Sequence, residues 1–359
     1  MAGMFRTPAD ARVPTPFKLK GVLVAHLQEG RVVRVMKRRL VRKSLDMLEE
    51  LSNREDTSAF NTFHENFGRN LKLGIIEDKD NQKTLAELIR FTSSQSGDSV
   101  VSLAKYAARM QEGQKSIYFV AASSKEAAAK SPFIEGLLKK KIEVLYLLEP
   151  IDEVALTNLQ KYGELELVDV SKEDVDAELA SEDEKKEKEE VQKEFEPLTK
   201  WMAKVLGAKV EKVVVSTRLG DSPCILATSK FGWSANMERI MRAQAMGDTA
   251  SYDYMKGRKI MEINPASPII NSLNAACKAP TEAATSQVEL LYDTAMLTSG
   301  FIIEQPADFA SRIFKMMNAS SSGEAAAAAE NGDKPKVAAA ATSATKVDVE
   351  VLSEGDAWN

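Results

Sequence analysis

The spacing of apolar residues predicts helices at the start of the chain. Over residues 31–55, "RVVRVMKRRLVRKSLDMLEELSNRE", apolar side chains recur at the spacing of one helix face, beneath a basic face. The segments "SAFNTFHENFGRNLKLGIIED" and "KTLAELIRFTSS" keep this period and end in polar, serine-rich turns. We therefore expect a long amphipathic helix followed by further helical segments.

The pattern then changes to short β-branched and aromatic runs. These are "KSIYFVAA" at residues 115–122 and "KIEVLYLLEP" at residues 141–150, with a helical stretch between them. Two such runs joined by a helix predict a βαβ unit with parallel strands and a right-handed crossover. After a short helix near Asp152, "ELELVDVS" predicts a third strand of the same sheet.

A run of dense mixed charge, "SKEDVDAELASEDEKKEKEEVQKEFEPL", follows Val170 and marks a boundary that leads into a solvated helix. A functional acidic patch is the alternative. The helix then gains apolar residues that should dock it on a second domain: Leu198, Trp201, Met202 and Leu206. Next, "VEKVVVSTRLGDSPCILATS" predicts an antiparallel hairpin around a Gly-Asp turn. Residues 319–359 have little to bury, which predicts a disordered tail.

Composition narrows the class of protein. The 359 residues are 44% hydrophobic with a net charge of −5, which favours a soluble chain of two domains and gives no electrostatic reason to expect nucleic acid. No apolar run reaches the length of a membrane span. Residues 1–30 lack the apolar block of a secretory signal, and a transit peptide is the weaker alternative.

The residues offer little to catalysis. Cys224 lies in an apolar run that predicts a buried, inert thiol, and His26 and His64 are too far apart in sequence to indicate zinc. The turn after the first predicted strand, "AASSKEAAAKS", contains no glycine, which argues against a dinucleotide or P-loop site. The residues by themselves favour an interaction or scaffolding protein, with an enzyme as the minority alternative.

The stretch "FGWSANMERIMRAQA", residues 231–245, predicts a helix that begins at Ala235 with Ser234 as its N-cap. Arg239 and Arg242 lie on its polar face. Its other face carries Met237, Ile240, Met241 and Ala245. Such a helix either packs on its own domain or presents adaptable methionines to a partner beside Trp233, and the pattern leaves both open.

The stretch "SQVELLYDTAMLTSGF" predicts a helix that is apolar on two faces. A small domain offers one core, so the second face suits a partner chain. Gly300 should end this helix and Pro306 should open the next. We predict a four-helix contact between two chains, against an ordinary intradomain hairpin as the alternative. The predicted interface comprises Leu290, Leu291, Ala295, Leu297, Phe309, Ile313 and Met316.

Longer segments resemble the middle-to-C-terminal half of the heat-shock protein 90 family of molecular chaperones. They include "FGRNLKLGIIED", "SPFIEGLLKKKIEVLYLLEPIDEVAL", "DSPCILATSKFGWSANMERIMRAQA" and "LLYDTAMLTSGF", and they run in order over residues 27–318. The segments "KEFEPLTKWM", "AQAMGDT", "GRKIMEINP" and "LNAACK" look most like the plastid branch. This resemblance implies the plastid stroma, with the cytoplasm as the alternative.

The resemblance implies an α/β plus α+β fold. We expect a small three-layer βαβ middle subdomain followed by an α+β dimerisation domain and a disordered tail. The expected boundaries are an atypical, unstructured start at residues 1–26, the end of the middle domain at 27–172, the dimerisation domain at 173–318 and the tail at 319–359.

The resemblance also implies a chaperone that binds unfolded or partly folded client proteins as a homodimer. The implied client-binding residues are Trp233, Met237, Ile240 and Met241. The alternative is a non-catalytic dimerisation partner, or dominant-negative regulator, that forms heterodimers with a full-length chaperone. The ending "LSEGDAWN" lacks the acidic motif that cytosolic members offer to TPR co-chaperones, so none are expected.

Full-length members use ATP and magnesium in an N-terminal domain, which this sequence is expected to lack. The family's phosphate-reaching arginine corresponds to Val24 here, and Gln28 alone survives of that loop. Valine cannot stabilise phosphoryl charge. We therefore expect this chain to hold no cofactor or metal and to hydrolyse no ATP.

Overall fold

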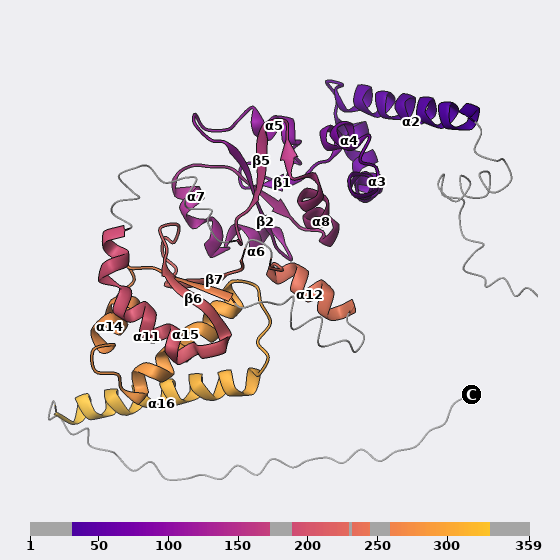
Figure 1. Cartoon of the computed structure of the whole chain (residues 1–359). Helices are drawn as coiled ribbons and strands as arrows, with labels where there is room; N and C mark the ends of the chain where they lie inside the picture. Colours follow the sequence, from indigo (N-terminus) through magenta and orange to yellow (C-terminus); the bar gives the residue numbers. More distant parts are fainter. Residues whose placement is uncertain (1–30, 173–188, 230–231, 245–258, 331–359) are drawn as a thin grey trace, which may run out of the picture. The chain divides into compact units, whose positions relative to one another are not determined.

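The computed structural model describes residues 31–172, 189–229, 232–244 and 259–330 (Figure 1). The expectations for residues 1–26, for most of the charged run and for residues 331–359 lie outside these ranges. The chain divides into one unit that ends at Pro306 and a second that begins at Ala307.

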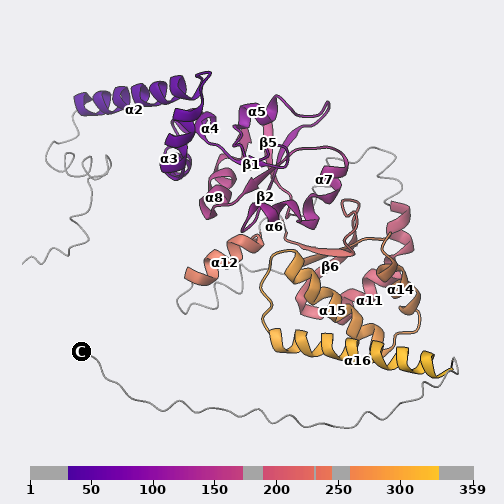
Figure 2. The same cartoon turned by 180° about the vertical axis from the view of Figure 1, so that it is seen from behind.

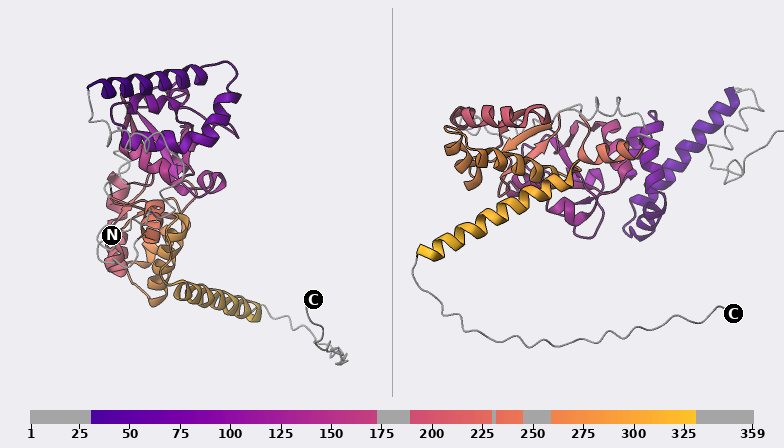
Figure 3. Two further views of the ribbon diagram at one scale, coloured as in Figure 1. Left: turned by 90° about the vertical axis from the view of Figure 1, so that its right-hand side faces the viewer. Right: turned by 90° about the horizontal axis from the view of Figure 1, so that it is seen from below.

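The first helices form where the apolar spacing predicts them. Figure 3 shows the first of them as one uninterrupted helix. Their bounds are α2 (Arg31–Ser52), α3 (Ser58–Glu77) and α4 (Gln82–Leu88). The apolar stripe of α2 is buried only toward its C-terminal end, at Leu45. Toward its start, Val32, Met36 and Leu40 are exposed.

The predicted βαβ unit is confirmed and belongs to a five-stranded sheet of order β1-β3-β2-β5-β4. Strand β2 pairs in parallel with β3 and with β5, as expected for the three runs. The strands are β1 (Thr92–Ser93), β2 (Ser116–Ala121), β3 (Val144–Leu147), β4 (Lys161–Tyr162) and β5 (Leu165–Asp169). The intervening helices are α5 (Leu103–Ala107), α6 (Lys125–Ala129), η2 (Pro132–Ile134), α7 (Glu135–Lys139) and α8 (Pro150–Leu159).

Alternate residues of the central strands point to opposite sides of this sheet, and the residues on both sides are buried. Phe119 and Leu145 pack into a core with residues of α3, α4 and α8. Tyr118 and Val144 pack into another core with α6, η2 and α7. The sheet therefore lies between two helical layers, which confirms the three-layer subdomain expected for this part.

The second sheet corrects a prediction. Its strands are β6 (Val210–Val215), β7 (Cys224–Ala227) and β8 (Lys259–Ile263), in the order β6-β8-β7. The predicted antiparallel hairpin of the first two strands is wrong, because β8 lies between them, parallel to β6 and antiparallel to β7. The turn expected to close the hairpin is instead held by the first sheet's subdomain, where the Glu135 carboxylate accepts hydrogen bonds from the amides of Gly220 and Asp221.

Helices cover the second sheet and complete an α+β domain, which confirms the expected fold class (Figure 2). They are α11 (Glu196–Leu206), α14 (Pro268–Ala276) and α15 (Glu282–Thr298), and η3 (Gly207–Lys209) links α11 to β6. Helix α12 (Ala235–Gln244) instead extends away from this sheet and lies against α8. Leu198, Met202 and Leu206 of α11 are buried in the core of this domain, as their spacing predicts. Gly300, with a φ of 83°, follows the end of α15 in the expected position.

A buried ion pair lies where the two sheets' subdomains meet. The Arg218 guanidinium binds the Glu262 carboxylate, and both side chains are almost fully buried. Arg218 also donates through Nη1 to the carbonyl oxygen of Val170 at 2.6 Å. Gly136 of α7 packs against the backbone of Arg218, which leaves no space there for a side chain. These contacts join the two subdomains within the first unit.

Helix α16 (Pro306–Glu330) opens at Pro306 as predicted, and from Ala307 onward it belongs to the second unit. The helix runs past residue 318, where the tail was expected to begin. The added length is rich in alanine, which has the highest intrinsic helix propensity. Within the described parts of the chain, none of the helices has the length and apolar character needed to cross a membrane.

Candidate functional site

Helix α12 begins where its sequence predicts. The hydroxyl of Ser234 accepts a hydrogen bond from the amide of Met237 at 3.1 Å. This is the N-cap contact that satisfies one of the free amides in the first turn of a helix. The cap is local in sequence, so it could be predicted from the residue types alone.

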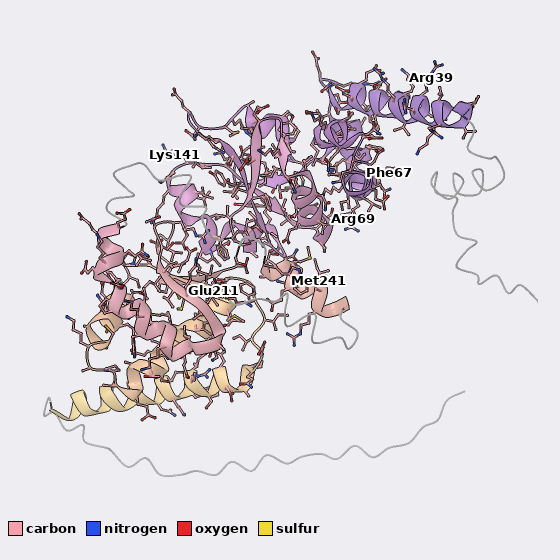
Figure 4. The ribbon with its side chains drawn as sticks, viewed as in Figure 1. Arg39, Phe67, Arg69, Lys141, Glu211 and Met241 are labelled. Atoms are coloured by element: carbon pink, nitrogen blue, oxygen red, sulfur yellow. The ribbon has the colours of Figure 1, made fainter. Side chains whose placement is uncertain are left out.

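The four predicted client-binding residues lie together on and just before α12. Trp233, Met237, Ile240 and Met241 are all half-buried, neither enclosed in a core nor fully exposed (Figure 4 labels Met241). Met237, Ile240 and Met241 share one helix face by their spacing. Arg239 and Arg242 are exposed, as expected for the polar face. The role of these residues in client binding stays a prediction.

A carboxylate from the first subdomain binds the start of α12. Glu153 of α8 accepts hydrogen bonds from the Ser234 hydroxyl at 2.5 Å and from the side-chain amide of Asn236 at 3.0 Å. Burial raises the pKa of Glu153, as does the charge of Asp169, whereas the two hydrogen bonds and Lys172 lower it. Residue type and spacing do not single out Glu153, because acidic residues are common in the first turn of a helix.

A second polar contact holds the same turn of α12 from the second subdomain. Lys259 of β8 donates to Glu238 at 3.1 Å, and both side chains are buried. The Lys259 ammonium also lies 4.3 Å from the centre of the Phe301 ring, within range of a cation–π interaction. The first turn of α12 is thus attached by charged and hydrogen-bonded groups, and its apolar face remains half-buried.

The predicted dimer residues of α15 separate into two faces. Leu291 and Ala295 are buried in the core of their own domain. Leu290 is half-buried and Leu297 is 49% exposed on the other face. This is the division that a helix apolar on two sides predicts. The binding of a second chain to the exposed face stays a prediction.

The remaining predicted dimer residues belong to α16. Phe309 and Ile313 are half-buried, and Met316 is 49% exposed. Two further apolar side chains of this helix, Phe314 and Met317, are also exposed. An exposed apolar strip of this kind suits a protein contact.

Residues that could serve catalysis have structural roles where the structure describes them. Cys224 is buried, and burial raises the pKa of its thiol to about 12, so it stays protonated as the sequence suggested. His64 accepts a hydrogen bond from the Arg90 amide. Its pKa is lowered to about 4 by burial and by Lys72 and Arg90, so the ring is neutral at pH 7.

Neither a metal cluster nor a phosphate loop is evident in the described residues. No group of three or more histidine, cysteine, aspartate or glutamate side chains among them could hold a metal ion. In the glycine-free turn after β2, the Ser124 hydroxyl accepts the Ala127 amide at 3.1 Å. The start of α6 is therefore capped by its own chain.

Comparison with known proteins places this architecture in a family. Residues 23–349 match the family described as Hsp90 protein. The chain is 49% identical to the Arabidopsis thaliana protein named Heat shock protein 90-5, chloroplastic, over 92% of this chain and 43% of the relative. It is 48% identical to Heat shock protein 90-6, mitochondrial, from the same plant, over 85% of this chain and 39% of the relative.

A more distant relative is an Arabidopsis endoplasmin homolog, 39% identical over 80% of this chain and 37% of that protein. The chain therefore spans less than half the length of these relatives. The match nevertheless includes both subdomains, α12 and α15. The family match and the identity to the organellar proteins confirm the resemblance read from the sequence, and the chain belongs to the Hsp90 protein family.

Proposed function

We propose that this chain binds unfolded or partly folded client proteins as a homodimer and so assists their folding. Membership of a chaperone family supports the general activity. The observation that carries the specific proposal is α12, whose apolar residues are half-buried while polar contacts hold its first turn. A helix held in this way can offer apolar surface without unfolding.

The side chains of α12 suit clients of varied sequence. Methionine is unbranched and polarisable, so Met237 and Met241 can repack against different apolar segments. Trp233 offers a large flat surface beside them. Full burial of an apolar side chain stabilises by about 1.5–3 kcal/mol, so a half-buried one would add about 1 kcal/mol when a client covers it.

Four contributions of this size give only weak binding once the cost of association is subtracted. A dimer brings two such helices to one client, which raises the effective concentration of the second site. The proposed homodimer would therefore strengthen client binding without any tighter individual contact. Exposed Leu297 of α15 and Met316 of α16 support an apolar contact between chains.

Replacing Leu297 and Met316 together by glutamate should convert a dimer into a folded monomer. Both side chains are about half exposed, so charge is tolerated in the monomer but would be buried unpaired in the contact. Light scattering after size exclusion gives the mass, and circular dichroism checks the fold. A wild-type monomer at micromolar concentration, or a double variant that stays dimeric, would refute this interface.

Met36→Glu together with Met47→Glu is the matched control for this experiment. Both residues lie on α2 and are 57% and 58% exposed, so this double variant adds the same two charges to a surface outside the proposed contact. It should leave the mass of the dimer unchanged. Leu291→Glu is unsuitable, because Leu291 is part of the domain core and its replacement would unfold the monomer.

The second candidate function is a dimerisation partner that regulates a longer chaperone. The same exposed residues of α15 and α16 favour it, since a relative with a similar surface could bind there. Such a regulator would co-purify with the longer protein and would not itself suppress client aggregation.

We further propose an organellar location, plastid first, because relatives named chloroplastic and mitochondrial share nearly half of the aligned residues.

We propose no nucleotide chemistry for this chain. The turn after β2 contains no glycine, which supports this proposal, because a phosphate loop needs glycines to bring its backbone amides close to the phosphate.

A further inference from the structure

One buried carboxylate connects the first subdomain to the start of α12. Glu153 is 4% exposed, and its two oxygens each accept one donor from the same helical turn: Oε1 from Ser234 and Oε2 from Asn236. We call Glu153, Ser234 and Asn236 the α12 clamp. Its members come from segments 81 residues apart in the chain, so the clamp is a tertiary contact.

The clamp also orients the N-cap of α12. The Ser234 hydroxyl has one hydrogen, which it donates to Glu153, while its oxygen accepts the Met237 amide. A serine that caps a helix without a further partner can rotate its hydroxyl freely. Here Glu153 fixes the hydroxyl, so the direction in which α12 leaves the cap depends on α8.

A neighbouring contact also holds the chain at the start of α12. The Lys172 ammonium, just beyond β5, donates to the carbonyl oxygen of Gly232, two residues before the cap. Lys172 also attracts Glu153, while Asp169 repels it. The first subdomain therefore holds the chain on both sides of Trp233. Hydrogen bonds to a desolvated carboxylate are among the stronger polar contacts in proteins.

We propose that Glu153 is a positioning residue for client binding, setting the orientation of α12 and thus of the apolar face that a client covers. The inference rests on the proposed client-binding function. The outer half of α12 is half-buried or exposed, so its orientation depends on how the first turn is held. Glu153 does not itself contact the client in this proposal.

Hydrogen exchange of the full chain without client tests the clamp. In Glu153→Ala, the amides of α12 should exchange about tenfold faster, as expected when hydrogen bonds to a charged group are lost. Glu153→Gln should restore part of the protection, because its amide can both accept from Asn236 and donate to the Ser234 oxygen. Unchanged exchange of α12 in a folded Glu153→Ala chain would overturn the proposal.

Glu149→Gln is the matched control. Glu149 lies beside α8 as its N-cap and pairs with Arg69 and Lys72 of α3, without a contact to α12 among those described. Because a glutamine oxygen can still cap α8, this variant should change the protection of α3 and leave that of α8 and α12 unaltered. If Glu153→Ala fails to fold, Asn236→Ala decides the question, since it removes one donor of the clamp from a half-buried position.

Client binding is measured separately, with reduced and carboxymethylated α-lactalbumin as a permanently unfolded probe. The Kd of Glu153→Ala should rise by about five- to tenfold, and that of Glu149→Gln should stay within about twofold. A loosened α12 with unchanged affinity would overturn the positioning role and leave the proposed function standing. If the wild-type chain does not bind the probe, the proposed client-binding function is wrong. Hydrogen exchange is measured without client, so it still shows whether the α12 clamp exists in that case.

Discussion

Gly136→Ala should lower the free energy of unfolding by about 2 kcal/mol or more, against the usual trend for helices. Alanine normally stabilises a helix interior by about 1 kcal/mol relative to glycine. At this position a Cβ atom would lie 2.5 Å from the carbonyl oxygen of Arg218 and 2.9 Å from its Cα. Both are backbone atoms, so no side chain can rotate away and α7 must move.

The movement would reach further than one contact. Glu135, the neighbour of Gly136, accepts the amides of Gly220 and Asp221 and the hydroxyl of Ser222. Displacing α7 would strain these hydrogen bonds together. Urea denaturation followed by circular dichroism gives the change in stability.

Gly74→Ala is the control for this prediction. Gly74 lies inside α3, and its added Cβ would meet the end of the Leu85 side chain at 3.0 Å, which can rotate. We expect its stability to change little, because the gain in helix propensity offsets a small rearrangement. A Gly136→Ala chain as stable as the Gly74→Ala chain would show that α7 and the Arg218 segment are not packed as described.

Arg218→Met should destabilise the chain by about 3–5 kcal/mol, because it leaves a buried carboxylate without its partner. Glu262 is buried, and Arg218 binds both of its oxygens. The substitution also removes the hydrogen bond to the carbonyl of Val170, which joins the two subdomains. Denaturant unfolding of the variant measures the loss.

A double-mutant cycle separates the ion pair from the packing around it. The chain with both Arg218→Met and Glu262→Gln should be more stable than the sum of the single losses predicts, since no unpaired charge remains buried. Additive losses would mean that the two side chains do not stabilise each other. The Ser216 hydroxyl, which donates to Glu262, can still bond to the glutamine.

The fold was predictable where its cause is local. The periods of α3 and α15 and the runs of β2 and β3 each follow from burial of a face or strand. The pairing of β6 with β8 was not predictable, because β8 comes after α12 in the chain and no local pattern specifies a distant neighbour. The Gly-Asp turn suggested a hairpin, whereas a carboxylate on α7 holds its amides.

The same distinction holds for the candidate site. Ser234 could be assigned as an N-cap, because the cap and its amide are three residues apart. The half-buried state of Met237 and Met241 could not be predicted, since it depends on where α12 meets other elements. Glu153 resembles any acidic residue in a first turn, and only the tertiary structure brings it to α12.

Suppression of client aggregation tests the central claim most directly. The wild-type chain should suppress the aggregation of thermally unfolded citrate synthase, and Trp233→Ala with Met237→Ala should lose most of this activity. Both side chains are half-buried, so the melting temperature should fall by only a few degrees, unlike truncation in a core, which costs about 2–5 kcal/mol. A double variant that melts far lower yet suppresses aggregation equally well per folded molecule would contradict the account.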